Sequence, residues 1–293
     1  MKVSYISKNL GRETLHRIAQ ATEIIDEYQA QGFTLTVRQI YYQFITRNWI
    51  PNEKRSYKLI ANALEKGRMN GLIDWKAIED RTRFLRGNNN WADPPAFLRD
   101  TSYRYRLDSR SDQDYLIEVW IEKDALIGVI SGICLELDVD YFSCRGYVSL
   151  SEMWRAAQRY QYDGRPCVIF HLGDHDPSGL DMTRVIKDTL VTFGCDDIEV
   201  RRVALNMDQI EQYKPPPNFV KPKDTRTDDY VEKYGQDSWE LDALSPQVMV
   251  DLIKENVDQL TNKAKRQRRI ELQNVQKAEI QIILEEDADD WEG

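Results

Sequence analysis

The chain has 293 residues, a formal net charge of −9 at pH 7, 41% hydrophobic residues and 10% aromatic residues. This length is sufficient for two domains with separate cores, and this composition argues against wholesale disorder. No apolar run approaches the roughly 18 residues that span a bilayer, and the polar start of the chain does not resemble a signal peptide. We therefore expect a soluble, cytoplasmic protein without a membrane partner.

Positive and negative charges are distributed unevenly along the chain. Residues 1–110 carry 19 Lys and Arg against 12 Asp and Glu, whereas the remainder carries 21 against 37. A basic front half suits contact with nucleic-acid phosphates, and an acidic rear half suits the binding of a cation. Ordinary variation between two domains would give the same pattern.

Residues 1–80 are predicted to form a small, mostly helical domain. Apolar residues at helical spacing predict a first helix over 11–29, and Thr36 is placed to cap a second helix that ends near Thr46. A third helix is predicted over 54–69, after a turn. Its outward face carries basic residues, namely Lys54, Arg55, Lys58, Lys66 and Arg68.

A short hairpin is expected to follow this basic helix. Gly71 ends the helix, and Leu72, Ile73 and Trp75 are the candidates for the hairpin strands. Helix, turn, basic helix and hairpin together describe a winged helix, whose basic helix lies in a DNA groove. The alternative is a small helical domain with a solvated, charged face.

Residues 81–112 are interpreted as a connector. Breaker segments such as 87–90 and 93–95 interrupt it. Its arginines, Arg81 and Arg83 among them, are interleaved with aromatic residues, and arginine can both neutralise phosphate and stack on bases. This segment is therefore a candidate contact with the DNA backbone rather than a reader of base sequence.

Carboxylates follow two predicted strands of the rear half. Residues 115–122 have the composition of a buried strand and end at Glu122, and a second apolar run leads to Asp174 and Asp176. Because side chains alternate along extended backbone, the two aspartates are expected to point the same way. Strand-end carboxylates meet at one edge of a parallel sheet, where they can hold Mg²⁺. The alternative is that this Asp-x-Asp-Pro segment is only a capped helix start.

The rear half alternates strand-like and helical segments over 113–245, with strands near residues 115, 140, 166 and 198. This alternation predicts an α/β domain with a mostly parallel sheet covered by helices on both faces. Residues 213–235, rich in proline and charge, are expected to form a surface loop. Glu240 and Asp242 are interpreted as acids at a helix start. Residues 246–293 are predicted to be helical with a frayed, acidic tail.

Two segments resemble the Toprim domain found in the A subunit of topoisomerase VI and in its relative, the meiotic double-strand-break transesterase. Residues 119–125 read Val-Trp-Ile-Glu-Lys-Asp-Ala, and residues 173–179 read Gly-Asp-His-Asp-Pro-Ser-Gly. The resemblance implies a Rossmann-like Toprim fold for the sheet domain. It also implies a Mg²⁺ site made by Glu122, Asp174 and Asp176.

The resemblance extends upstream to residues 38–42, Arg-Gln-Ile-Tyr-Tyr, which resemble the Arg-x-x-Tyr-Tyr motif of the same family. There the second tyrosine attacks a DNA phosphodiester and becomes linked to a 5′ phosphate, which implies this role for Tyr42. A phenol with a pKa of about 10 needs a base or a cation to react at neutral pH. Arg38, four residues earlier on the same helical face, can supply that cation. The alternative is that Tyr41 and its apolar neighbours pack and that Tyr42 is a surface aromatic.

The function implied by the resemblance is Mg²⁺-dependent cleavage of double-stranded DNA by tyrosine transesterification, as in type IIB topoisomerases. In the family a homodimer makes two cuts, with the tyrosine of one protomer working at the metal site of the other. Lys123 is a candidate second cation, or an ion-pair partner of the acids. In topoisomerase VI the A subunit works with a separate ATPase subunit, and this chain contains no Gly-x-x-x-x-Gly-Lys-Ser/Thr phosphate-binding motif. The resemblance therefore implies a separate ATPase subunit as a possible partner. The alternatives are that the chain acts alone without ATP, or that it makes breaks which it does not reseal.

Two other functions fit the same residues. A Toprim nuclease would hydrolyse DNA with metal-activated water, and would need Glu122, Asp174 and Asp176 but not Tyr42. A DNA-binding protein that keeps the fold without turnover would bind through the basic front half and show no Mg²⁺-dependent cleavage.

Overall fold

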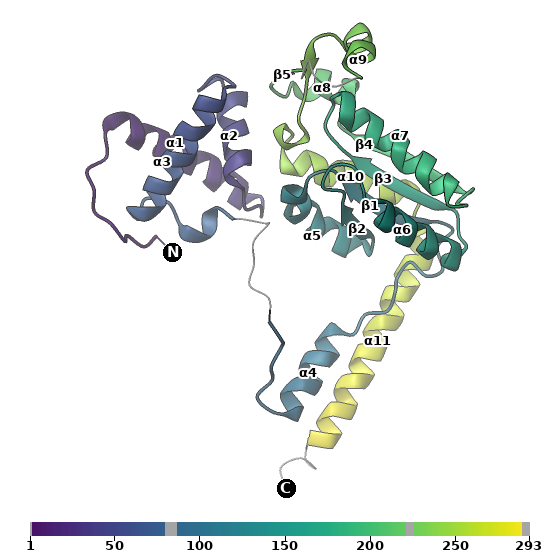
Figure 1. Ribbon diagram of the computed structural model, residues 1–293. Helices are drawn as coiled ribbons and strands as arrows, with labels where there is room; N and C mark the ends of the chain where they lie inside the picture. The colour runs from purple at the N-terminus through teal and green to yellow at the C-terminus, as the bar shows by residue number, and fades with distance from the viewer. Residues whose placement is uncertain (1, 80–86, 221–225, 289–293) are drawn as a thin grey trace.

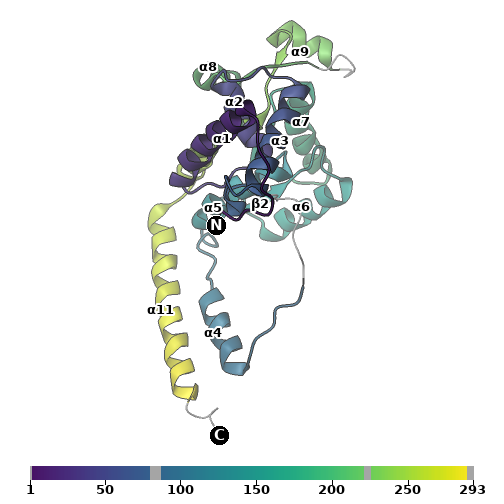
Figure 2. The ribbon, with the colours of Figure 1, turned by 90° about the vertical axis from the view of Figure 1, so that its left-hand side faces the viewer.

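The computed structural model describes residues 2–79, 87–220 and 226–288. It has three parts: an N-terminal helical domain, an α/β domain, and a helical arm that extends away from both (Figures 1 and 2). The N-terminal domain lies beside the α/β domain (Figure 1). No helix within the described ranges is long and apolar enough to cross a membrane.

The N-terminal domain contains the expected helices, α1 (Arg12–Ala30), α2 (Val37–Thr46) and α3 (Lys54–Met69). Thr36 caps α2 as predicted, because its hydroxyl accepts from the Gln39 backbone N–H while the Gln39 side chain accepts from the Thr36 N–H. This reciprocal capping box fixes where α2 begins. The three helices enclose their own apolar core, which includes Ile24, Ile40, Phe44, Ile60 and Leu64.

The hairpin predicted at Leu72, Ile73 and Trp75 is wrong. The segment instead turns into the short 3-10 helix η1 (Trp75–Ala77), because the Asp74 carboxylate accepts from the Lys76 N–H and caps it. Within the described part of this domain the extended pairings are isolated bridges, such as Ser4 with Asn70. Residues 80–86, with Arg81 and Arg83, lie outside the described residues.

The α/β domain is built on a parallel sheet of order β2-β1-β3-β4, as the alternation of segments predicted. The strands are β1 (Leu116–Ile121), β2 (Asp140–Ser143), β3 (Cys167–Leu172) and β4 (Ile198–Ala204). Ile121 at the end of β1 lies opposite Leu172 at the end of β3. The residues that follow these two strands therefore emerge side by side at one edge of the sheet.

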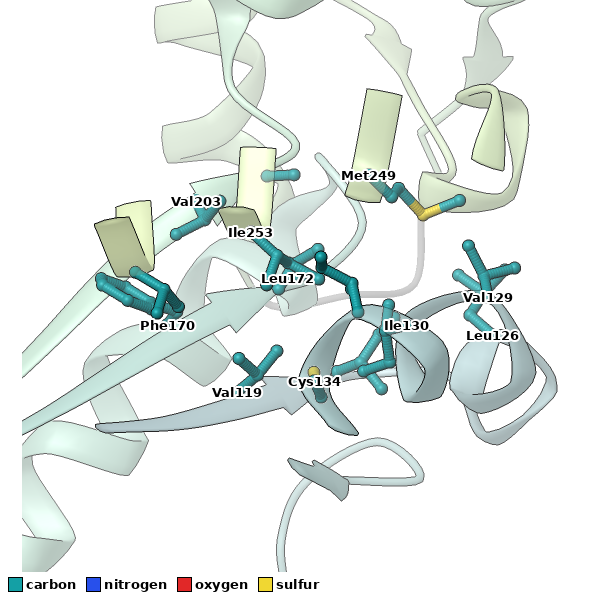
Figure 3. Packing of buried hydrophobic residues seen from close by; sticks show 14 of the residues in the cluster. Val119, Leu126, Val129, Ile130, Cys134, Phe170, Leu172, Val203, Met249 and Ile253 are labelled. Atoms are coloured by element: carbon teal, nitrogen blue, oxygen red, sulfur yellow. The ribbon is translucent and has the colours of Figure 1, made fainter. Parts of the chain in front are cut away.

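Helices cover both faces of this sheet, because neighbouring strand residues point to opposite sides. Val119 and Phe170 face α5 and α10 in one apolar cluster (Figure 3), whereas Trp120 and Ile169 face α6 and α7 in another. The four helices are α5 (Ile127–Leu137), α6 (Leu150–Asp163), α7 (Pro177–Thr192) and α10 (Pro246–Gln259). The predicted three-layer arrangement is thus confirmed.

The connector expected over 81–112 contains a helix, α4 (Pro94–Arg104), which pairs with α11 (Lys263–Ala288) to form the arm (Figures 1 and 2). The Tyr105 hydroxyl donates to Gln276 Oε1 at 2.6 Å, and the Leu107 N–H donates to Gln273 Oε1 at 2.9 Å. The breaker segment before α4 is a helix start: Asp93 caps α4, and prolines occupy its first turn.

The surface loop predicted over 213–235 is also wrong. It contains a strand that pairs with a later one and a helix whose Tyr230 is buried. Tyr230 anchors this helix to the α/β domain, because its hydroxyl is hydrogen-bonded to both the ring and the backbone of His175. The remaining elements are η2 (Asp124–Leu126), α8 (Met207–Tyr213), β5 (Asn218–Phe219), α9 (Thr227–Tyr234), β6 (Asp237–Ser238) and η3 (Leu241–Ala243).

Candidate functional site

Glu122 and Asp174 meet at the carboxyl ends of β1 and β3. The Glu122 N–H donates to Leu172 O at 2.8 Å, and the Asp174 N–H donates to Glu122 Oε2 at 2.8 Å. Burial, followed by the negative charge of Asp174, raises the pKa of Glu122 to about 7. The strand-end pairing predicted from the sequence is therefore present.

Asp174 is buried and held from two sides. Its Oδ1 accepts from the Leu241 N–H at 2.8 Å and lies 2.7 Å from Lys123 Nζ. Burial raises the pKa of Asp174, and the positive charge of Lys123 opposes that rise. Asp174 therefore joins the end of β3 to η3, which comes much later in the chain.

Asp176 caps α7, so the capped-helix interpretation holds for one of its oxygens. Its Oδ1 accepts from the Gly179 N–H at 2.7 Å and from the Ser178 hydroxyl at 3.0 Å. Its other oxygen, Oδ2, is not used in this cap, and the residue lines a cavity of the site. Capping and ligand binding are thus compatible at Asp176.

Two residues outside the predicted motifs, the half-buried Arg202 and the buried Tyr230, fix the backbone around these aspartates. Arg202 on β4 donates through Nη2 to the carbonyls of Gly173 at 2.8 Å and Asp174 at 2.5 Å, and through Nη1 to Gly179 O at 2.8 Å. Burial lowers the pKa of Arg202 to about 10. Its strand also carries Glu199 and Arg201, so the sequence does not single out Arg202. The second residue is Tyr230, which binds His175 between the two aspartates.

Lys123, directly after Glu122, supplies a positive charge to three carboxylates. Its Nζ lies 2.7 Å from Asp174 Oδ1, 2.6 Å from Glu240 Oε2 and 3.7 Å from Asp242 Oδ2. Burial alone would lower the pKa of Lys123, but the surrounding carboxylates reverse the effect and raise it. The ion-pair role considered for Lys123 is therefore the one the structure shows.

Glu240 and Asp242 were missed as site residues, because their sequence pattern also fits acids at a helix start. Glu240 directly precedes η3 and Asp242 lies within it. Both form ion pairs with Arg38 from α2: Arg38 Nη2 with Glu240, and Arg38 Nε with Asp242 Oδ2 at 2.7 Å. Their carboxylates lie between Arg38 and Lys123. This cluster joins the two domains.

Tyr42 lies beside Arg38, as the motif spacing predicted. The guanidinium carbon of Arg38 is 5.8 Å from the centre of the Tyr42 ring. Tyr42 is only 4% exposed, so it is not a surface aromatic. Burial and then the charge of Glu240 raise the pKa of the Tyr42 phenol, while the positive charge of Arg38 opposes the rise. Tyr41 is also buried, and its hydroxyl is hydrogen-bonded to Asn52 Oδ1 at 3.0 Å.

The tyrosine helix and the carboxylates that it meets belong to one chain. Besides the Arg38 ion pairs, Ala243 of η3 packs into the core of the N-terminal domain. Asn52 Nδ2 adds a second link, donating to Pro217 O at 3.0 Å and to Asn218 Oδ1 at 2.6 Å. The site is therefore composed of residues from both domains.

A cavity of about 510 Å³ lies at this junction. Lys54 of α3 contributes to it from one domain, and Asp176 and Ser178 from the other. The remaining lining residues are Pro177, Asn218, Phe219, Ser238, Trp239 and Glu240. One cation, Lys54, and two carboxylates, Asp176 and Glu240, therefore line the same cavity.

The basic residues predicted to contact DNA differ in their exposure to solvent. Lys54, Arg55 and Lys58 are exposed on α3. Arg68 instead folds onto its own domain, with its guanidinium carbon 4.6 Å from the Trp75 ring centre and Nη2 donating to Trp75 O at 3.2 Å. A second cavity, of about 340 Å³, lies between α1 and α3 and is lined by Arg55 and Lys58. Arg17 and Lys66 line it as well and add two more cations to this surface.

The carboxylates suit Mg²⁺ in their chemistry, since this ion prefers oxygen ligands and keeps several waters. Within the described ranges, however, no group of three or more His, Cys, Asp or Glu side chains is arranged to hold a metal ion. Lys123 Nζ occupies the position of a cation against Asp174. The candidate ligands are Glu122, Asp174 and Asp176, because their carboxylate oxygens are of the kind that this ion binds.

No protein-family model matches this chain, and no curated protein matches its sequence. The interpretation of the site therefore depends on its residues and their geometry.

Gly179 is expected to be irreplaceable in the first turn of α7. A Cβ at this position would lie 2.1 Å from the backbone oxygen of Asp174, which cannot move without breaking the strand end. Gly179→Ala should therefore lower the free energy of unfolding by about 3 kcal/mol or more. The matched control is Gly132→Ala in α5, where a Cβ meets nothing within 4 Å and should add up to about 1 kcal/mol. Urea unfolding of both variants checks the prediction, and equal stability would contradict it.

Glu122 should make stability depend on pH in a definite direction. Because its pKa in the folded protein, about 7, lies above the ordinary 4.5, the folded state binds this proton more tightly than the unfolded chain. The free energy of unfolding of the wild type, measured relative to Glu122→Gln, should therefore fall as pH rises from about 4.5 to about 7 and then level off. Urea unfolding across this range measures the difference. A difference that does not change with pH would contradict the prediction.

Proposed function

We propose that this protein cleaves double-stranded DNA by transesterification, with Tyr42 as the nucleophile and with 5′ ends linked to the protein. One observation carries the proposal. Arg38, on the tyrosine helix, pairs with Glu240 and Asp242, and the same two carboxylates bind Lys123. Lys123 in turn contacts Asp174 of the Toprim-like motif.

The cavity at the junction suits a phosphate of the DNA backbone. Lys54 provides a positive charge, and the first turn of α7 adds the positive end of a helix dipole beside it. The exposed cations of α3 and of the cavity between α1 and α3 continue the positive surface on the N-terminal domain. These contacts would hold the backbone rather than read the bases.

In the proposed reaction the Tyr42 oxygen attacks phosphorus, a new O–P bond forms, and the bond from phosphorus to the 3′ oxygen breaks. The phenol proton passes to a base. Glu240 is the candidate base, because its charge acts on Tyr42. The leaving 3′ oxygen takes up a proton and becomes a hydroxyl. Arg38 stabilises the negative charge on the phenol oxygen. Mg²⁺, when bound by Glu122, Asp174 and Asp176, would stabilise charge on the phosphate.

The homodimer and the separate ATPase subunit are proposals that come from the resemblance. Two chains would supply two tyrosines and hence two cuts, one in each strand. In the family the tyrosine acts across the dimer, whereas Tyr42 here lies next to carboxylates of its own chain. We therefore propose that each chain holds a complete site.

Hydrolysis by a Toprim-like nuclease is the second candidate. The burial of Tyr42 favours it, because a phenol that is 4% exposed must become accessible before it can reach a phosphate. Water in the cavity would then attack instead of Tyr42. Such an enzyme needs Glu122 and the two aspartates but not the tyrosine.

Cleavage of supercoiled plasmid separates these functions. DNA is incubated with Mg²⁺ and protein, the reaction is stopped with detergent, and breaks and protein-linked 5′ ends are measured. We expect linked breaks with the wild type, none with Tyr42→Phe, and wild-type levels with the control Tyr162→Phe, whose ring is 95% exposed on α6.

Free-ended breaks that persist in Tyr42→Phe but disappear in Glu122→Ala would show hydrolysis instead. The absence of any breaks with the wild type would contradict both forms of cleavage and favour a DNA-binding role.

A further inference from the structure

The long helix of the arm, α11, carries a stripe of exposed apolar side chains. Four large apolar residues of this helix are 43–55% exposed, namely Leu272, Val275, Ile282 and Ile283. Residues three and four apart share one face of a helix, so these four lie together. Gln273 and Gln276 are on a different face, where they are hydrogen-bonded to the segment that follows α4. The pairing of α11 with α4 therefore leaves an apolar face of the arm exposed.

The base of the arm is bonded to the α/β domain, so the direction of this face is fixed. Lys265 Nζ lies 2.8 Å from Asp114 Oδ1, and Arg269 Nε donates to Asp108 O at 3.1 Å. These cations at the start of α11 are thus used within the chain, and the exposed face itself carries an acid, Glu279. A DNA phosphate is consequently a poor match for this face. Because the arm extends away from both domains, a second helix has room to lie along it (Figures 1 and 2).

The stripe is complementary to a second copy of itself that runs in the opposite direction. Arg268, Leu272, Val275 and Glu279 are all exposed, at the alternating spacing of four and three residues that forms the seam between paired helices. The midpoint between Leu272 and Val275 is also the midpoint between Arg268 and Glu279. A two-fold axis at this point places Leu272 opposite Val275 of the second copy, and Arg268 opposite Glu279 of the second copy. A parallel pair would instead place like charges together.

We propose that two copies of this chain associate through their arms, with the α11 helices packed antiparallel about that midpoint. The apolar pair at the centre is then covered twice, and the two charge pairs set the register. In the same register Ile283 lies opposite Ala264 of the second copy, where the small side chain leaves space for it. No residue of the candidate site takes part, so the inference is independent of the proposed reaction and leaves each chain its own site.

Sedimentation velocity of the full chain tests the association. We expect the wild type to form a dimer, and Val275→Asp to weaken it about a hundredfold, because each dimer would bury the new charge twice. The matched control is Leu135→Asp on α5, which replaces an apolar residue that is 58% exposed outside the arm. Urea unfolding verifies that both variants keep the fold. A wild type that stays monomeric at high micromolar concentration, or a dimer that Val275→Asp leaves as tight as before, would overturn the inference.

Charge reversal tests the antiparallel register. Arg268→Glu and Glu279→Arg, each made alone, bring like charges together across the contact and should weaken the dimer about tenfold. The double variant restores opposite charges at both positions, so it should associate as the wild type does. An equal mixture of the two single variants should likewise form mixed dimers. A double variant that is no tighter than the single variants would overturn the proposed register and, with it, the inference.

Discussion

The structure depends on one cluster of charges, in which Arg38 and Lys123 are bound to carboxylates from two distant parts of the chain. Glu240 accepts both cations, Asp242 contacts both, and Asp174 is bound by Lys123. These contacts fix the position of the tyrosine helix relative to the strand ends. They also bring Arg38, which lies beside the buried Tyr42 ring, to carboxylates that Lys123 binds.

Such a cluster is a poor way to gain stability, because charges removed from water lose hydration that their mutual attraction only partly replaces. Asp242 shows this: its Oδ1 is buried without a hydrogen-bond partner among the described residues. Buried polar atoms are normally satisfied, so an exception within a group of ion pairs fits a functional site better than a structural one. Arg202 is a different kind of cation, since backbone carbonyls rather than carboxylates accept from its guanidinium, and these bonds hold the Asp174 turn.

Local patterns in the sequence predicted most of the fold. Thr36, Gly71 and the apolar periodicity located the helices of the N-terminal domain, and the strand-like runs located all four strands of the parallel sheet. Residues that usually interrupt secondary structure led to two wrong predictions. Asp93 and the prolines after it start α4, and Asp74 caps a 3-10 turn where a hairpin was expected.

Only part of the candidate site could be predicted from the sequence. Motif spacing located Glu122, Lys123, Asp174 and Asp176, because strand ends determine their positions. Glu240, Arg202 and Tyr230 become partners of the motif only through the tertiary fold. No local rule distinguishes Glu240 from an acid at a helix start.

The most direct test of a site formed within one chain is complementation between two inactive variants. Tyr42→Phe and Glu122→Ala chains are co-expressed, so that mixed assemblies form if chains associate, and linked DNA breaks are measured against the wild type. The account predicts no recovery, because each chain lacks one half of its own site. Recovery of linked breaks would show that the tyrosine of one chain acts at the carboxylates of another, and would contradict the account.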